Sequence, residues 1–366
     1  MAKYKLGEIC EIVSGSTPKT GIAEYWDGNL KWITPAEIDD ESYIITDSAR
    51  KLTELGVKKT GLSSFPSEAV ILSSRAPIGK VAIAGCEMYC NQGFKNLICS
   101  DRINNRYLYW FLKGNTAYLN SLGRGATFKE ISKKIVSDIE INVPEISQQL
   151  AAVDALERVS EIIRLRKNQL QKLDELIKAR FVELFGDPEL NPRGLPVLPW
   201  NAVFLTTTGK LDSNAMVENG RYPFFTCAKE SYKINSYAFD CEALLLAGNN
   251  AAGIYDVKHY KGKFNAYQRT YVLRLMNEKW SYILFKRQLE DKLQYLQSQS
   301  KGTNTRYLTL GILNELRFVV PPVAEQEQFA VFVEQTDKSK LAIQQSLDKL
   351  KTLRKSLMQE YYGQGE

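Results

Sequence analysis

A long, charged helical pattern occurs twice in this chain, and its two copies keep the same internal spacing. LQKLDELIKARFVELFGDP begins at Leu170 and LDKLKTLRKSLMQEYYGQG begins at Leu347, which gives an offset of 177 in the numbering (347 − 170 = 177). Each copy ends in two bulky residues followed by a glycine. A unit repeated at this distance is far longer than a solenoid repeat. The chain is therefore predicted to contain two copies of a whole domain plus a helix.

The repeat extends upstream of the helices into the globular parts. VPEISQQ matches VPPVAEQ, and RGATFKEIS at Arg124 matches KGTNTRYLT at Lys301, all at the same offset. Further upstream the offset drifts, as it should where connecting loops differ in length. Between Thr34 and Gly79 the first copy has 18 extra residues, because the offset falls from 192 to 174 across this stretch (192 − 174 = 18). The chain is therefore expected to contain two related but divergent globular domains, which are called heads.

The sequence patterns of the heads indicate β-rich domains. Together with the two long helices they predict an α+β fold for the whole chain. Short apolar runs such as AVILSSR and ALLLAGN predict buried strands, and YVLRL and IEINVP alternate as half-buried strands do. The predicted parts are a first domain at 1–143, a helix at 144–186, a second domain at 187–320 and a helix at 321–366. A pseudo-two-fold axis should relate the two copies.

Prolines mark the starts of both helices. Pro144 and the pair Pro321–Pro322 open them, where the missing N–H of proline would be unpaired anyway, and no further proline follows for about 40 residues. A narrow apolar stripe on so long a helix needs a partner helix, and the chain path makes the expected coiled coil antiparallel. The alternative is that each helix folds back on its own head. The residues expected to pack in this spacer are Leu156, Ile163, Leu170, Leu173, Ile177, Ile343, Leu347, Leu350 and Leu357.

The composition argues against catalysis by this chain. A single histidine, His259, rules out His-rich metal sites, and six cysteines without a CxxC pattern suggest reduced, mostly buried thiols. GxGxxG, P-loop and GxSxG patterns are absent. No apolar run is long enough to span a bilayer and the N-terminus lacks the apolar core of a signal peptide, so a cytoplasmic location is expected. A net charge of +6 permits binding to nucleic acid without requiring it.

Loops rich in cations, amides and hydroxyls occur at matched positions in both heads. They bring donors close to phosphates, and their glycines allow close backbone approach. Arg, Asn and Gln can also read guanine or adenine edges. A plain charged surface loop is the alternative for each, but the match between the copies favours DNA contact. The predicted DNA-binding residues are Arg75, Lys80, Asn91, Gln92, Lys95, Arg124, Thr127, Lys129, Asn249, Asn250, Gln268, Arg269, Lys301, Thr303, Asn304 and Arg306.

Several of these segments together resemble a known family. YKLGEICEIVSGSTPKTG, RAPIGKVAI with CNQGF, RGATFKEISKKIVSDIEINVPEISQQ and EQEQFAVFVE resemble the DNA-specificity (S) subunit of type I restriction–modification enzymes, in the family's order and over nearly the whole chain. The resemblance implies that each head is a target-recognition domain that reads one half of a bipartite, asymmetric DNA sequence. It implies that the helices separate the heads, and that this chain has no catalytic residue, no metal and no cofactor of its own.

The resemblance also implies partners. They are double-stranded DNA, two methyltransferase (M) subunits that carry S-adenosylmethionine, and motor-nuclease (R) subunits, with no role for a membrane. The main alternative is a scaffold that binds proteins through its coiled coil and makes no contact with DNA. A stand-alone methyltransferase is a more distant alternative.

Overall fold

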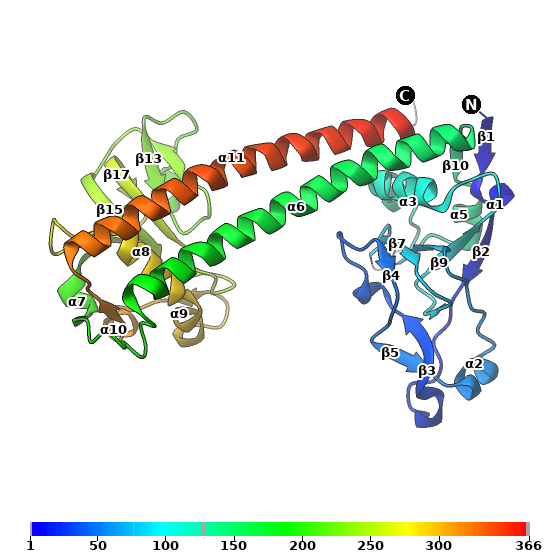
Figure 1. Cartoon of the computed structure of the whole chain (residues 1–366), viewed down its shortest axis with the longest axis horizontal. Helices are drawn as coiled ribbons and strands as arrows, with labels where there is room; N and C mark the ends of the chain where they lie inside the picture. Colours follow the sequence, from blue (N-terminus) through cyan, green and yellow to red (C-terminus); the bar gives the residue numbers. More distant parts are fainter. Residues whose placement is uncertain (1, 76, 126–128, 364–366) are drawn as a thin grey trace. The chain divides into compact units, whose positions relative to one another are not determined.

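Two units make up the chain, and each contains one head together with segments of both long helices. The computed structural model describes residues 2–75, 77–125 and 129–363. Unit 1 comprises Met1–Lys167 and Gln345–Glu366, and unit 2 comprises Asn168–Gln344. Each unit therefore holds the start of one long helix and the end of the other (Figure 1).

The head of unit 1 is built on a five-stranded sheet of order β2-β9-β6-β7-β4. A three-stranded sheet, β5-β3-β8, and a terminal pair, β1-β10, complete it. The helix α3 packs on β6 and β7. The strands are β1 Ala2–Lys5, β2 Cys10–Ser14, β3 Trp26–Ile33, β4 Ile44–Ile45, β5 Arg50–Leu52, β6 Val70–Leu72, β7 Val81–Ala84, β8 Tyr89–Cys90, β9 Lys95–Cys99 and β10 Glu140–Val143. The helices are α1 Leu6–Ile9, η1 Ala23–Tyr25, η2 Pro35–Glu37, α2 Glu54–Thr60, α3 Asn105–Gly114, α4 Thr116–Ser121 and α5 Lys133–Ser137.

The head of unit 2 repeats this plan on a six-stranded sheet of order β12-β18-β15-β17-β13-β14. Its pairs β11-β20 and β16-β19 lie outside that sheet, and α8 packs on β15 and β17. The strands are β11 Val197–Pro199, β12 Phe204–Thr208, β13 Tyr222–Phe225, β14 Tyr232–Ile234, β15 Phe239–Ala247, β16 Asn249–Asn250, β17 Val257–Ala266, β18 Thr270–Leu275, β19 Arg306–Tyr307 and β20 Arg317–Val319. The helices are α7 Trp200–Val203, η3 Ser213–Ala215, α8 Tyr282–Asp291, α9 Leu293–Gln299 and α10 Leu310–Asn314.

The long helices are α6, Ile146–Phe185, and α11, Val323–Tyr362. Gly186 ends α6 with a φ of 77°, a left-handed conformation that glycine adopts without a steric penalty. In unit 2, Phe181 and Phe185 at the end of α6 contact Phe329 near the start of α11. In unit 1, Leu156 near the start of α6 shares a core with Tyr362 at the end of α11. The helices are therefore antiparallel in both units.

The stripe residues predicted to pack in the spacer turn inward. Four are buried, and the other five are half-buried. The buried residues are Leu156, Ile163, Ile177 and Leu347. The half-buried residues are Leu170, Leu173, Ile343, Leu350 and Leu357. None of the described helices, α6 and α11 included, has the length and apolar character that crossing a bilayer requires.

Candidate nucleic-acid interface

Three loops of head 1 meet beyond the ends of β6 and β9. Ser74, in the loop after β6, joins the loop of Gly93 to the loop of Ile131. Its N–H donates to the Gly93 carbonyl at 2.7 Å, and its carbonyl accepts from the Ile131 N–H at 2.9 Å. Arg75 and Arg124 each form an isolated bridge with Glu130. The backbone itself therefore brings Arg75, the turn at 91–93, Arg124 and Glu130 together, although the sequence predicted these parts separately as DNA-binding loops.

Head 2 gathers its loops with the same hydrogen bonds. The Gly248 N–H donates to the Arg269 carbonyl, and the Leu308 N–H donates to the Gly248 carbonyl, both at 2.8 Å. Lys301 and Tyr307 form the bridge that corresponds to Arg124 and Glu130, again at the offset of the sequence repeat. Asn249 and Asn250 pair with Tyr307 and Arg306 as β16 and β19. Both heads therefore present one loop framework with different side chains.

The cations of head 1 differ in how far they reach solvent. Lys95 is only 7% exposed; its ammonium lies 3.4 Å from a Glu130 carboxylate oxygen and also donates to Ser74 Oγ. Arg75 lies 3.6 Å from the other oxygen of the same carboxylate. Lys80 donates to the Pro35 carbonyl at 2.8 Å. Lys95 is thus placed to hold Glu130 and its loop in position, whereas Arg75 and Lys80 are half-exposed at the surface.

Most of the other predicted residues are exposed, and two amides are committed to turns. The Asn91 side-chain oxygen accepts from the Gly93 N–H at 2.9 Å, and that of Asn250 accepts from the Ala252 N–H at 2.8 Å. Their NH2 groups remain available as donors. Asn249 is half-buried. Thr127 lies outside the described residues. The exposed residues are Gln92, Arg124, Lys129, Gln268, Arg269, Lys301, Thr303, Asn304 and Arg306.

Sequence reasoning missed one loop of this surface. The segment SGSTPKTG, which follows β2, packs on the turn at 91–93: the Ser16 N–H donates to the Cys90 carbonyl, and the Thr17 hydroxyl contacts the side-chain oxygen of Gln92. A Cβ atom at Gly15 would meet the Cys90 carbonyl oxygen at 2.1 Å, so only glycine permits this approach. The Gly/Ser-rich composition was the available signal, although by itself it indicates no particular ligand.

Head 2 has a hollow among its predicted DNA-binding residues. The hollow has a volume of about 310 Å³ and is bordered by Gln268, Arg269, Tyr271 and Tyr307. The Tyr271 hydroxyl donates to the Leu308 carbonyl, and burial raises the pKa of this hydroxyl. Tyr271 is therefore neutral, and the hydrogen bond fixes its ring at the border of the hollow. Amide and guanidinium donors next to aromatic rings can contact base edges and base faces.

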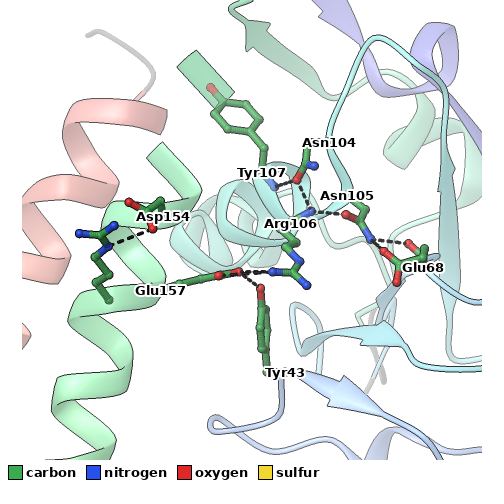
Figure 2. Close-up of polar contacts among 9 residues, drawn as sticks. Tyr43, Glu68, Asn104, Asn105, Arg106, Tyr107, Asp154 and Glu157 are labelled. Atoms are coloured by element: carbon green, nitrogen blue, oxygen red, sulfur yellow. Dashed lines mark hydrogen bonds and ion pairs between the residues drawn. The ribbon is translucent and has the colours of Figure 1, made fainter. Parts of the chain in front are cut away.

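A polar joint connects head 1 to α6 (Figure 2). Asn104 caps α3 by accepting from the N–H groups of Arg106 and Tyr107. The Arg106 guanidinium pairs with Glu157 of α6 at 3.3 Å, and the Tyr43 hydroxyl donates to the same carboxylate. Burial and this carboxylate raise the pKa of the Tyr43 hydroxyl, which keeps it protonated as a donor. The described part of the chain holds no cluster of three or more side chains suited to bind a metal ion.

Comparison with known proteins identifies the family. The family model for the type I restriction modification DNA specificity domain matches residues 1–175 and 203–352. The chain belongs to this family. It is 30% identical over 397 residues to the type I restriction enzyme MjaIX specificity subunit of Methanocaldococcus jannaschii, covering 97% of this chain and 90% of that protein. It is 36% identical over 173 residues to the EcoDI specificity subunit of Escherichia coli, covering 45% of this chain and 38% of the relative.

Solved structures of the specificity family share the fold. The S subunit from M. genitalium superposes with a TM-score of 0.64 at 15% identity, covering 100% of this chain and 96% of that one. A chain from a study of type I R-M complex assembly superposes with a TM-score of 0.57 at 19% identity, covering 99% and 97%. The predicted resemblance and the predicted α+β fold with two related domains are confirmed.

Proposed function

We propose that this chain is the DNA-recognition subunit of a type I restriction–modification complex and that it has no catalytic activity of its own. Each head would read one half of a bipartite, asymmetric sequence. One observation carries the proposal: the two heads share a hydrogen-bonded loop framework but display different side chains on it, such as Glu130 against Tyr307. A shared framework suits a common task, and different side chains suit different half-sites.

The exposed side chains are of the two kinds that DNA recognition needs, one for phosphates and one for base edges. Arg124 and Lys129 in head 1, and Lys301 and Arg306 in head 2, are cations suited to phosphates. Gln92 and Gln268 are exposed amides beside them, suited to base edges in the major groove. The two long helices would keep the half-sites at a fixed separation, because forty residues of helix extend roughly 60 Å.

Matched grooves support docking of a partner present in two copies. In unit 1 a groove of about 1,210 Å³ lies between α3 and the long helices, and in unit 2 a groove of about 770 Å³ takes the equivalent place beside α8. Trp110 and Arg287 occupy matched positions of the repeat (287 − 110 = 177), and each lines the groove of its own unit. Equivalent grooves in the two units suit one kind of partner that binds twice.

The expected occupants are two methyltransferase (M) subunits. S-adenosylmethionine would bind to them and not to this chain, and motor-nuclease (R) subunits would complete the complex. Extraction of an adenine from the stack by M would be helped by a grip on both flanks of the site. As a reader of cellular DNA, the chain would act in the cytoplasm.

Deletion of the gene should remove one bipartite methylated motif from the host genome. Single-molecule sequencing of modified adenines, with and without the gene, measures this directly. The motif should return when the gene is restored. If no bipartite motif disappears, the proposal is wrong, and a gel shift at low salt then tests whether the chain is a protein-binding scaffold that never touches DNA.

The exposed loop cations should set the salt dependence of binding. Changing Arg124 or Lys301 to alanine should weaken binding to all DNA sequences and reduce the slope of log K against log salt by about 1 for each phosphate that is no longer neutralised. Lys349, an exposed residue of α11 far in sequence from the loops, provides the control substitution to alanine. A fluorescence titration across salt concentrations measures the slopes. Slopes equal to the wild-type value would remove these loops from the interface.

A further inference from the structure

A short segment of head 1, Asp39–Tyr43, connects the head to both α3 and α6, and is named here the strap. Its backbone carbonyls accept from α3: the Lys113 ammonium donates to the Asp40 carbonyl at 2.8 Å, and the Tyr109 hydroxyl donates to the Ser42 carbonyl at 3.1 Å. The Tyr43 ring meets the Tyr109 ring edge-on, with centroids 4.9 Å apart. On the other side, the Ile83 N–H donates to the Tyr43 carbonyl and joins the strap to the sheet.

The strap also reaches α6 at two points. The Tyr43 hydroxyl donates to the Glu157 carboxylate, which pairs with Arg106 of α3 as well (Figure 2). Further along the helix, Glu41 pairs with Lys167. The second pair is largely exposed and contributes little, whereas the Glu157 side chain is only 29% exposed and has two partners on the head. Glu157 is thus the main polar connection between the strap and α6.

The contacts of Glu157 add a directional constraint at the place where head 1 packs on α6. The apolar core of unit 1 holds α6 through Ala152, Val153 and Leu156, close to the start of the helix. Glu157 directly follows Leu156 in α6, and its carboxylate binds Arg106 of α3 and Tyr43 of the strap at that point. Because hydrogen bonds are directional, these contacts resist tilting of head 1 against α6 more strongly than the apolar core alone.

This connection is particular to the first copy. The strap lies in the stretch where the first copy has its extra residues. Position 283 in unit 2, which corresponds to Arg106, is isoleucine, and among the described residues Glu334, which corresponds to Glu157, forms no ion pair. Tyr43 likewise has no tyrosine counterpart joined to Glu334 in that part of the chain. The carboxylate at this position of the long helix therefore joins the head in unit 1, whereas among the described residues of unit 2 it does not, and that head contacts α11 elsewhere, as in the hydrogen bond from Ser281 to Gln326.

We propose that Glu157 and the strap are positioning elements that fix the angle of head 1 on α6 and thereby limit the complex to one spacer length between the half-sites. The proposal rests on the function proposed above. It assigns Glu157 no contact with DNA. A head held less firmly would accept its half-site at neighbouring positions along the duplex.

The test uses the full complex of this chain with its cognate methyltransferase subunits and a plasmid library. Each plasmid carries the two half-sites separated by the wild-type spacer or by one or two base pairs more or fewer. Wild type should methylate only the natural spacer. For each variant, methylation at the altered spacers is divided by methylation at the natural spacer. Glu157→Ala should raise this ratio about tenfold for spacers one base pair longer or shorter, because a tenfold change corresponds to the loss of one charged hydrogen bond.

Three further variants separate positioning from general damage. Tyr43→Phe removes one hydroxyl and keeps the ring, so it should fold and show the same relaxed spacing even if Glu157→Ala does not assemble. Glu157→Gln keeps an acceptor for Tyr43 and should restore most of the discrimination. Asp154→Ala removes an exposed pair with Arg158 on the same helix that does not touch the head, and should behave as wild type (Figure 2).

The outcomes distinguish this proposal from the function on which it rests. If wild type methylates no bipartite site, the proposed function fails. If wild type is specific for one spacer and Tyr43→Phe and any assembled Glu157→Ala complex keep that single spacer, the positioning role of the strap is wrong while the proposed function stands.

Discussion

Replacing Gln149 with leucine should lower the free energy of unfolding of unit 1 by about 3 kcal/mol or more, the largest effect expected for a single polar residue here. The Gln149 side chain is fully buried. Its oxygen accepts from the Asn104 N–H at 2.8 Å, and its NH2 group donates to the carbonyls of Arg102 at 3.0 Å and Pro144 at 2.8 Å. One amide thus joins the start of α6 to the start of α3. Leucine would leave three backbone groups without partners.

The neighbouring residue provides a matched control. Gln148 is exposed, so Gln148→Leu makes the same chemical change on the same helix without breaking these hydrogen bonds. Urea unfolding, with hydrogen exchange to assign each transition to a unit, measures the difference. Equal midpoints for the two leucine variants would show that the buried amide does not stabilise unit 1.

The second copy contains the same device. Gln326, the counterpart of Gln149 in the repeat (326 − 149 = 177), is fully buried; it accepts from the Ser281 N–H at 3.0 Å and donates to the Pro321 carbonyl at 2.8 Å. Both glutamines follow the helix-opening prolines in the matched segments VPEISQQ and VPPVAEQ. The offset alone predicted that these positions correspond. The hydrogen bonds to the heads could not be predicted, because Asn104 and Ser281 each lie 45 residues away in sequence from the glutamine that accepts from them.

The sequence predicted the features that repeat and missed those that do not. The correspondence of Arg124 with Lys301 reappears as equivalent backbone bridges, since insertions elsewhere leave the shared local framework intact. The strap was visible only as surplus length, because nothing in DDESY indicates that Tyr43 would meet a helix more than a hundred residues later. Lys95 looked like an exposed cation, and only the fold places Glu130 beside it. The pairing of β1 with β10 likewise joins distant ends of the head.

The two units fill the joint between the long helices with different side chains. In unit 2, Phe329 of α11 fills the space between the two helices: the centroid of its ring lies 5.6 Å from that of Phe181 and 5.7 Å from that of Phe185, both on α6. The equivalent position in unit 1 is Ala152. There the bulk comes from the head instead, because the Tyr107 ring lies 4.7 Å from Tyr362. Similar volume is thus supplied from different elements, which fits the tight packing of protein interiors.

Phe329→Ala should therefore destabilise unit 2 by about 3–5 kcal/mol, because the truncated side chain is fully buried and its loss leaves a cavity against two phenylalanine rings. Val331→Ala is the control, since Val331 is 53% exposed on the same helix and should change stability by less than about 0.5 kcal/mol. Calorimetry of the whole chain, with hydrogen exchange to assign the transitions, should show an earlier transition of unit 2 in Phe329→Ala only. If both variants unfold together with wild type, the aromatic cluster does not hold α6 and α11 together in unit 2.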